Sequence, residues 1–170
     1  MNKIKGFTII EVLIAVSILG MMLLLLMAFI FGLNFSNYKT KSDREVLENA
    51  RRALDQITYE IKNAQSIYTP TTTQNQLSLQ TTHYLPTGET TTFVDFFLCG
   101  AALCLKKESG APIILTSDSV QISNLTFTQI KNTNFPSVRV SMTVDYRNPD
   151  AGSGHFASIT LSSTASVRSY

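Results

Sequence analysis

Glu11 is the residue of this 170-residue chain whose surroundings most require a chemical explanation. It is the single ionisable side chain in the 27 residues from Phe7 to Leu33. A carboxylate placed inside a membrane costs about 3 kcal/mol, so it needs a partner of opposite charge. A cut between Gly6 and Phe7 would create an α-ammonium four residues before Glu11. We therefore predict that the Phe7 amine pairs with Glu11 of the same helix or of an adjacent subunit. The alternative is that Glu11 lies in the headgroup layer.

The two cysteines, Cys99 and Cys104, are separated by four residues. We expect them at the two ends of a four-residue hairpin loop, where facing Cα atoms lie about 4.5–5.5 Å apart, within disulfide range. The sequence therefore predicts a disulfide, which would stabilise the hairpin by roughly 2 kcal/mol. It also indicates an oxidising compartment outside the cytoplasm. Buried free thiols are the alternative, whereas a redox pair more often has a two-residue spacer.

Asp145, Asn148 and Asp150 lie beside Gly152 and Gly154 and could supply oxygen ligands to calcium. The spacing of an EF-hand loop is absent, however, and a turn rich in Asp, Asn and Gly accounts for these residues more simply. We therefore predict no cofactor, with a calcium site at these three residues as the alternative.

The two histidines, His83 and His155, lie in polar stretches without a neighbouring Cys–His or Ser–His–Asp arrangement. Two cysteines and two histidines are also too few for a four-ligand zinc site unless carboxylates contribute. We therefore expect a protein that is not an enzyme.

The charge of the chain disfavours one class of partner, nucleic acid. Fourteen Lys and Arg stand against 12 Asp and Glu, and the basic residues do not cluster in any segment. Nucleic-acid binding depends largely on neutralising phosphates, so binding by bulk charge is disfavoured. Charged residues make up only 15% of the chain and apolar ones 44%, which argues against a disordered protein.

The apolar run that contains Glu11 is long enough to cross a bilayer. Helical residues from Val12 to Leu33 would cover roughly 33 Å. A cleaved secretory signal peptide is the alternative, but its apolar region is shorter and ends at a small-x-small site. Met27-Ala28-Phe29 does not supply such a site. Residues 7–33 are therefore predicted to form a hydrophobic membrane helix.

Residues 34–66 are predicted to continue this helix as an amphipathic half, giving one helix of about 55–60 residues. Ser42-Asp43-Arg44-Glu45 matches a capping box, so either the helix restarts there or the match occurs by chance inside one helix. Apolar residues recur at spacings of three and four, which places them on one stripe that faces a core. They are Val46, Leu47, Ala50, Leu54, Ile57, Ile61 and Ala64.

Residues 67–170 are predicted to form an antiparallel, β-rich globular head. Apolar and polar residues alternate along several segments, as in strands with one buried face. The alternation slips by one residue near Ser123-Asn124, which indicates a bulge. The fold class is therefore α+β, with a long helix packed on an antiparallel sheet. The expected strands include 77–81, 93–98, 103–107, 120–127, 138–146 and 157–167.

The segment Lys5–Ala15, KGFTIIEVLIA, resembles the processing site of type IV prepilins and type II secretion pseudopilins. The resemblance implies a leader of residues 1–6, cleavage after Gly6 by a membrane aspartyl peptidase, and N-methylation of Phe7. It also implies assembly through Phe7 and Glu11, with the apolar helix packed in a filament core. The implied partners are the prepilin peptidase/N-methyltransferase, other pilin or pseudopilin subunits, the inner-membrane assembly platform, and membrane lipid before assembly.

The resemblance also suggests which kind of subunit this is. Major pilins often carry a Pro within the apolar segment, whereas Ala28 occupies that position here and the first proline is Pro70. Residues 51–64 resemble the second helical half of J-type minor pseudopilins. We therefore expect a structural, minor, J-like subunit of a pilus, secretion or competence filament. It would be anchored once in the cytoplasmic membrane with its head outside, and later enter the filament. The alternative is a binding module at a pilus tip that holds DNA, a surface or a secreted protein.

Overall fold

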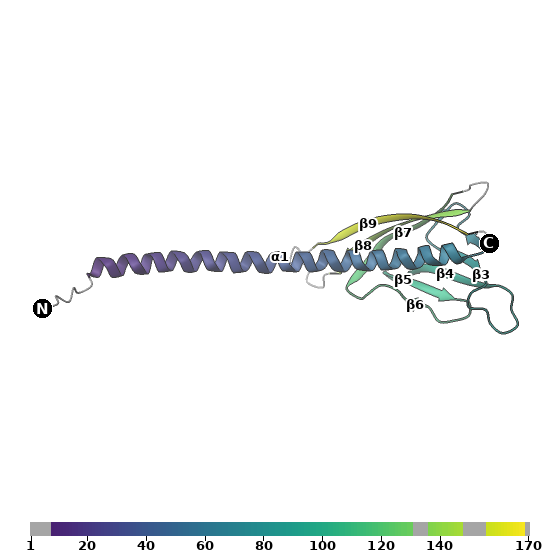
Figure 1. Cartoon of the computed structure of the whole chain (residues 1–170), viewed down its shortest axis with the longest axis horizontal. Coiled ribbons are helices and arrows are strands. Elements are labelled where there is room, and N and C mark those ends of the chain that lie inside the picture. Colours follow the sequence, from purple (N-terminus) through teal and green to yellow (C-terminus); the bar gives the residue numbers. More distant parts are fainter. Residues whose placement is uncertain (1–7, 131–135, 148–155, 169–170) are drawn as a thin grey trace. The chain divides into compact units, whose positions relative to one another are not determined.

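The computed structural model describes residues 8–130, 136–147 and 156–168, apart from the side chains of residues 34 and 35. One helix, α1, is followed by nine strands, β1 to β9 (Figure 1). The chain divides into two compact units, residues 1–40 and 41–170. The elements are α1 (Ile9–Asn63), β1 (Ser66–Thr69), β2 (Thr73–Gln74), β3 (Leu77–Thr81), β4 (Thr92–Cys99), β5 (Ala102–Lys107), β6 (Ile113–Ile114), β7 (Val120–Ile130), β8 (Ser137–Tyr146) and β9 (Ser158–Ser166).

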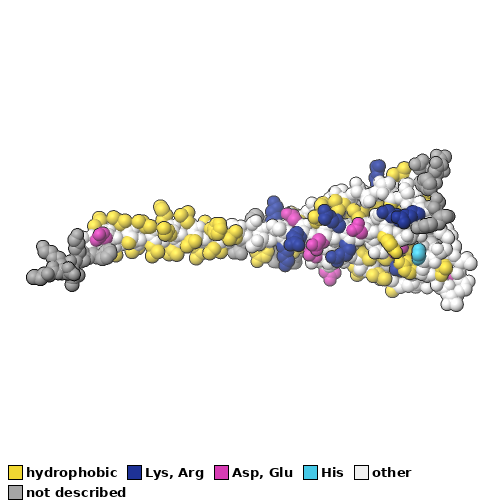
Figure 2. Space-filling view, in the orientation of Figure 1, with side chains coloured by type: hydrophobic (Ala, Val, Ile, Leu, Met, Phe, Trp, Pro, Cys, Tyr) yellow, Lys and Arg dark blue, Asp and Glu magenta, His cyan; other side chains and the backbone are white. Residues whose placement is uncertain are grey.

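In the first unit, the part of α1 from Ile9 to Leu33 is apolar on all sides apart from Glu11 and Ser17. The described side chains from Ile9 to Leu33 are exposed, and Figure 2 shows the apolar ones covering this part of the helix. By length and composition, α1 is the one helix in the described part of the chain that could cross a membrane. A helix that is apolar all round is unstable in water, so this segment requires lipid or other helices around it.

In the second unit, one stripe of α1 is buried against the strands. The predicted stripe is confirmed at Val46, Ala50, Leu54, Ile57 and Ile61, whereas Leu47 is half-exposed. The facing core comes from the inward positions of the sheets, including Leu77, Phe96, Phe127, Val140 and Met142. Burial of these side chains stabilises the unit at roughly 25 cal/mol for each Å² of apolar surface removed from water.

The strands form two antiparallel sheets, a division that the sequence did not predict. One has the order β1-β3-β4-β5-β6 and the other β2-β7-β8-β9. The strand predicted at 77–81 is confirmed as β3, and the bulge is confirmed as a register shift between Ile122 and Asn124. The short strands β1, β2 and β6 were not predicted, because four or fewer residues carry too little alternation to be recognised.

The helix continues through Ser42-Asp43-Arg44-Glu45, so the match to a capping box there occurred by chance, and the expectation of one helix of about 55–60 residues is confirmed. It ends at Asn63, three residues before the predicted boundary at residue 66. The Ala64 N–H donates to the Ile61 carbonyl at 3.3 Å, and the Gln65 N–H donates to the Gln80 carbonyl on β3 at 2.8 Å. After Ala64, hydrogen bonds to β3 therefore replace the helical hydrogen bonds.

Polar contacts fix α1 of the second unit to the turn before β7. The Asn49 side-chain oxygen accepts from the Ser117 N–H at 2.9 Å, and Glu45 Oε1 accepts from the Ser117 hydroxyl at 3.1 Å. Asn49 is itself buried, and its amide nitrogen donates to the Glu45 carbonyl. A buried amide left without partners would destabilise the fold, so these bonds fix the position of the turn.

We predict that Ile57→Ala lowers the free energy of unfolding by about 2–5 kcal/mol, because it removes buried methyl groups and leaves a cavity. Urea unfolding of the full chain in detergent micelles, followed by tyrosine fluorescence, measures this. Tyr59→Ala is the matched control, because Tyr59 is a larger side chain on the same helix but is 57% exposed. An equal loss in both variants would contradict burial of the Ile57 stripe.

Candidate assembly site

The first turn of α1 is closed by hydrogen bonds between Thr8 and Glu11. The Thr8 N–H and hydroxyl donate to Glu11 Oε2 at 3.0 and 2.9 Å, and the Glu11 N–H lies 3.4 Å from the Thr8 hydroxyl oxygen. This reciprocal arrangement is a capping box with Thr8 as the N-cap residue. The motif Thr8-Ile9-Ile10-Glu11 is therefore where the helix begins, although from the sequence we noted a capping-box match only at Ser42.

The capping box gives Glu11 partners that were not predicted from the sequence. A carboxylate at the N-terminus of a helix also interacts favourably with the helix dipole. A carboxylate offers about four acceptor positions, and the Thr8 bonds converge on Oε2 alone. Among the described residues, none donates a hydrogen bond to Glu11 Oε1. This oxygen keeps the capacity to accept a hydrogen bond from an ammonium group.

Gly6 and Phe7, the predicted processing and methylation residues, lie outside the described residues. The ion pair between the Phe7 amine and Glu11 therefore remains a prediction. Further along the apolar segment, the Ser17 hydroxyl donates to the Leu13 carbonyl at 2.8 Å, which satisfies this polar group within its own helix. Serine hydroxyls commonly bond in this way inside helices, so Ser17 requires no polar neighbour in lipid.

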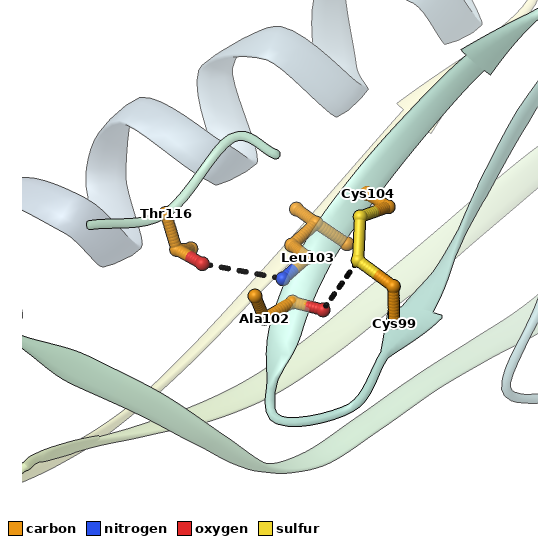
Figure 3. The surroundings of a disulfide bond; sticks show 5 residues. All are labelled: Cys99, Ala102, Leu103, Cys104 and Thr116. Carbon is orange, nitrogen blue, oxygen red and sulfur yellow. Dashed lines mark hydrogen bonds between the residues drawn. A yellow bond between two sulfur atoms is a disulfide. The ribbon is translucent and has the colours of Figure 1, made fainter. Parts of the chain in front are cut away.

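The structure joins Cys99 and Cys104 in a disulfide with a Cα–Cα distance of 5.9 Å (Figure 3). The loop differs from the expected one: Cys99 pairs with Ala102, so the hairpin turn has two residues, not four. Gly100 has a φ of +70°, which a tight two-residue turn requires and glycine adopts without strain. The cysteines are thus diagonal neighbours across β4 and β5.

We predict that replacing both cysteines by serine lowers the free energy of unfolding by roughly 2 kcal/mol, because the closed loop is short. Urea unfolding with and without reductant measures this: reductant should destabilise the wild-type chain and leave the double variant unchanged. A wild-type chain that is insensitive to reductant while its disulfide is shown to be cleaved would contradict a stabilising role.

The three residues of the alternative calcium site are only partly described. Asp145 Oδ1 accepts a hydrogen bond from the Ser158 hydroxyl at 2.5 Å, and Asn148 and Asp150 lie outside the described residues. Within the described residues, no group of three or more His, Cys, Asp or Glu side chains is placed to hold a metal ion. His83 lies beside the Tyr84 ring, with centroids 6.2 Å apart, and His155 is outside the described residues.

A hollow on the five-stranded sheet was not predicted from the sequence. It has a volume of about 330 Å³ and is lined by Tyr68, Ser78, Phe93, Asp95 and Glu108. The Tyr68 and Phe93 rings meet edge to face, and Asp95 accepts a hydrogen bond from Ser78. The sequence predicts that residues 93–98 form a strand with one buried and one outward face. It does not show which strands pair with this one, so the neighbours of β4 on β1 and β3 could not be predicted.

Glu108 Oε2 accepts hydrogen bonds from the Thr92 hydroxyl at 2.6 Å and the Phe93 N–H at 2.9 Å. These bonds favour the charged form and hold the pKa of Glu108 below its ordinary value. Because the pKa of Glu108 is lower in the folded state than in the unfolded state, its ionisation stabilises the fold at pH values above the unfolded-state pKa. This stabilisation is lost as the pH falls through the folded-state pKa.

We predict that part of the acid destabilisation of the chain comes from Glu108. Urea unfolding at pH 6 and pH 3 should show a smaller loss of stability on acidification in Glu108→Gln than in the wild type. Glu89→Gln is the matched control, because Glu89 is an exposed glutamate in the loop before β4. An identical pH dependence in Glu108→Gln and the wild type would contradict the role of the two hydrogen bonds.

Residues 1–27 match the family model of the prokaryotic N-terminal methylation motif. No curated protein and no solved structure matches the chain. The matched segment contains Gly6, Phe7, the Thr8–Glu11 capping box and most of the apolar part of α1. The motif supports a pilin or pseudopilin, a structural subunit that prepilin peptidase processes and that assembles with other pilin subunits.

Proposed function

We propose that the protein is a minor subunit of a type IV pilus, type II secretion or competence filament. Its precursor is cleaved after Gly6, Phe7 is N-methylated, and the chain assembles through its N-terminal helix. The observation that carries this proposal is that the first part of α1 is exposed, apolar and long enough to cross a bilayer. Its first turn holds a single carboxylate, Glu11, which accepts hydrogen bonds from Thr8.

The apolar segment explains how one chain serves in both membrane and filament. Its described side chains from Ile9 to Leu33 are exposed within the chain, so lipid covers them before assembly and neighbouring helices cover them afterwards. In the membrane the leader lies on the cytoplasmic side and the head outside. The disulfide between Cys99 and Cys104 supports this orientation, because disulfides persist in oxidising compartments.

Glu11 sets the position of a new subunit. Its Oε1 accepts the Phe7 ammonium of the same or an adjacent helix, while Thr8 continues to donate to Oε2. Loss of one partner from a desolvated ion pair leaves the other charge uncompensated, at about 3–5 kcal/mol. Subunits displaced from the correct register are therefore disfavoured.

The minor, J-like character rests on the apolar segment and on residues 51–64. α1 is continuous from Ile9 to Asn63, and Ala28 occupies the position where major pilins often have proline. A binding module at the filament tip is the second candidate. The hollow on the five-stranded sheet, lined by Tyr68 and Glu108 among others, favours this second candidate, because its aromatic and carboxylate groups are open to solvent.

Mass spectrometry of the protein purified from its native membranes tests the processing step. We expect a mature chain that begins at Phe7 and carries one N-methyl group. A functional protein that retains residues 1–6 would overturn the proposed processing.

We predict that Glu11→Ala is cleaved normally but enters filaments about tenfold less, or lower still, because the ammonium loses its partner. Immunoblots of sheared filaments and membranes measure the ratio. Thr8→Val is the matched control: it removes the capping hydroxyl but keeps the carboxylate, and should assemble better than Glu11→Ala. Normal incorporation of Glu11→Ala would refute the assembly role of Glu11.

A further inference from the structure

Among the described strands, β9 is the outermost strand of the four-stranded sheet β2-β7-β8-β9 and pairs on one side only, with β8 (Figure 1). It pairs with β8 over nine consecutive residue pairs without a register shift. Its residues from Ser158 to Ser166 include no charged residue and no proline. A regular, uncharged edge of this length presents unpaired backbone groups to any extended chain.

The hydrogen-bond register shows which backbone groups point outward. The Tyr146 N–H donates to the Ala157 carbonyl, and the Val167 N–H donates to the Pro136 carbonyl, so the odd-numbered residues of β9 bond to β8. Bonded and outward-pointing residues alternate along an antiparallel strand. The outward N–H and C=O groups therefore belong to the even-numbered residues of β9. All of these are exposed residues with a hydroxyl group: Ser158, Thr160, Ser162, Thr164 and Ser166.

The described strands at the other sheet edges are short or irregular. Strands β2 and β6 have two residues each, and β1 has four, with a register shift between Ile67 and Thr69. Short strands and irregular pairing are ways in which proteins prevent strand addition. On β9 the hydroxyls instead support regular pairing: Thr160 bonds to Thr143 and Ser166 to Ser137.

Two hollows lie at the ends of β9, each between α1 and the residues that flank the strand. The first has a volume of about 200 Å³, and Val46, Leu47 and Ile159 line it together with Asp43, Ala157 and Ser158. The second is larger, about 330 Å³, and brings Lys62 and Arg168 together with Asp55. Strand addition gains affinity from backbone hydrogen bonds and specificity from pockets that receive alternate side chains.

We propose that the free edge of β9 binds an extended segment of another polypeptide as an added antiparallel strand. The segment is uncharged where it pairs with β9, because none of the nine β9 residues has a charged side chain that could pair with a charge on the segment. An antiparallel segment starts at Ser166, beside the Arg168 side chain, because the Arg168 N–H already donates to the Lys62 carbonyl of α1 at 3.4 Å. It ends near Val46. An acidic side chain near its first residue therefore meets Lys62 and Arg168, which outnumber Asp55 in that hollow. An apolar side chain near its last residue contacts Val46, Leu47 and Ile159 in the other hollow.

The test uses the full chain in detergent micelles and a fluorescent, acetylated and amidated peptide: Glu, then four Thr-Val pairs, then Leu. We expect binding by fluorescence anisotropy, and protection of the Thr160, Ser162 and Thr164 amides from hydrogen exchange. The control peptide carries N-methyl groups on two adjacent central residues, which removes hydrogen-bond donors from both of its edges, and should not bind.

Ser162→Lys should weaken peptide binding at least tenfold, because it places a charge on the free edge. Ser141→Lys is the matched control: Ser141 is the β8 partner of Ser162, on a strand paired along both sides, and should change binding less than twofold. Unchanged thermal unfolding checks that each variant is folded. If Ser162→Lys does not fold, Thr164→Lys takes its place with the same expectation.

Absent binding, or equal binding of the N-methylated peptide, would overturn the proposal. So would equal weakening by both lysine variants, which would place the peptide on the sheet face. Protection that appears without peptide and grows with protein concentration would identify a second copy of this chain as the occupant and exclude the proposed segment. None of these outcomes depends on Gly6, Phe7 or Glu11, so the proposed processing and assembly are tested separately.

Discussion

One uninterrupted helix has to be stable in two different surroundings, and the rest of the structure follows from this constraint. From Ile9 to Leu33 its side chains, apart from Glu11 and Ser17, are apolar around the whole circumference, which suits lipid or a bundle of helices. Beyond residue 41 only one stripe is apolar, and Ile57 and Ile61 are fully buried by the sheets. The backbone satisfies its own hydrogen bonds throughout, which a segment in hydrocarbon requires. The change in side-chain pattern therefore separates the anchoring segment from the head without any break in the helix.

The single acid in the apolar segment lies where the helix can best hold it. At the third helical position, Glu11 accepts hydrogen bonds from Thr8 that would otherwise be lacking at a helix N-terminus. The Thr8–Glu11 capping box thus gives the carboxylate a fixed orientation before any partner arrives. The proposed ammonium then adds to a carboxylate that is already oriented, which reduces the entropy lost when subunits associate.

The parts of the fold that could be predicted are those with long periodic patterns. The helix, its buried stripe, the strand at 77–81 and the bulge near Ser123 all follow from spacing within one segment. Two sheets could not be predicted, because the partner of each strand depends on contacts distant in sequence. The capping boxes show the same limit: Ser42 and Thr8 carry the same motif, and only the continuing helical pattern on both sides of Ser42 distinguishes a chance match. The hollow beside Glu108 depends on three strands, so no single segment indicates it.

The hairpin that carries the disulfide also bears on how the head matures. Two cysteines allow only one intramolecular pairing, and their five-residue separation keeps the thiols close even in an unfolded chain. Oxidation of the two thiols therefore cannot form an incorrect bridge within one molecule, and no disulfide rearrangement is needed. An oxidant suffices, and an isomerase has no intramolecular error to correct.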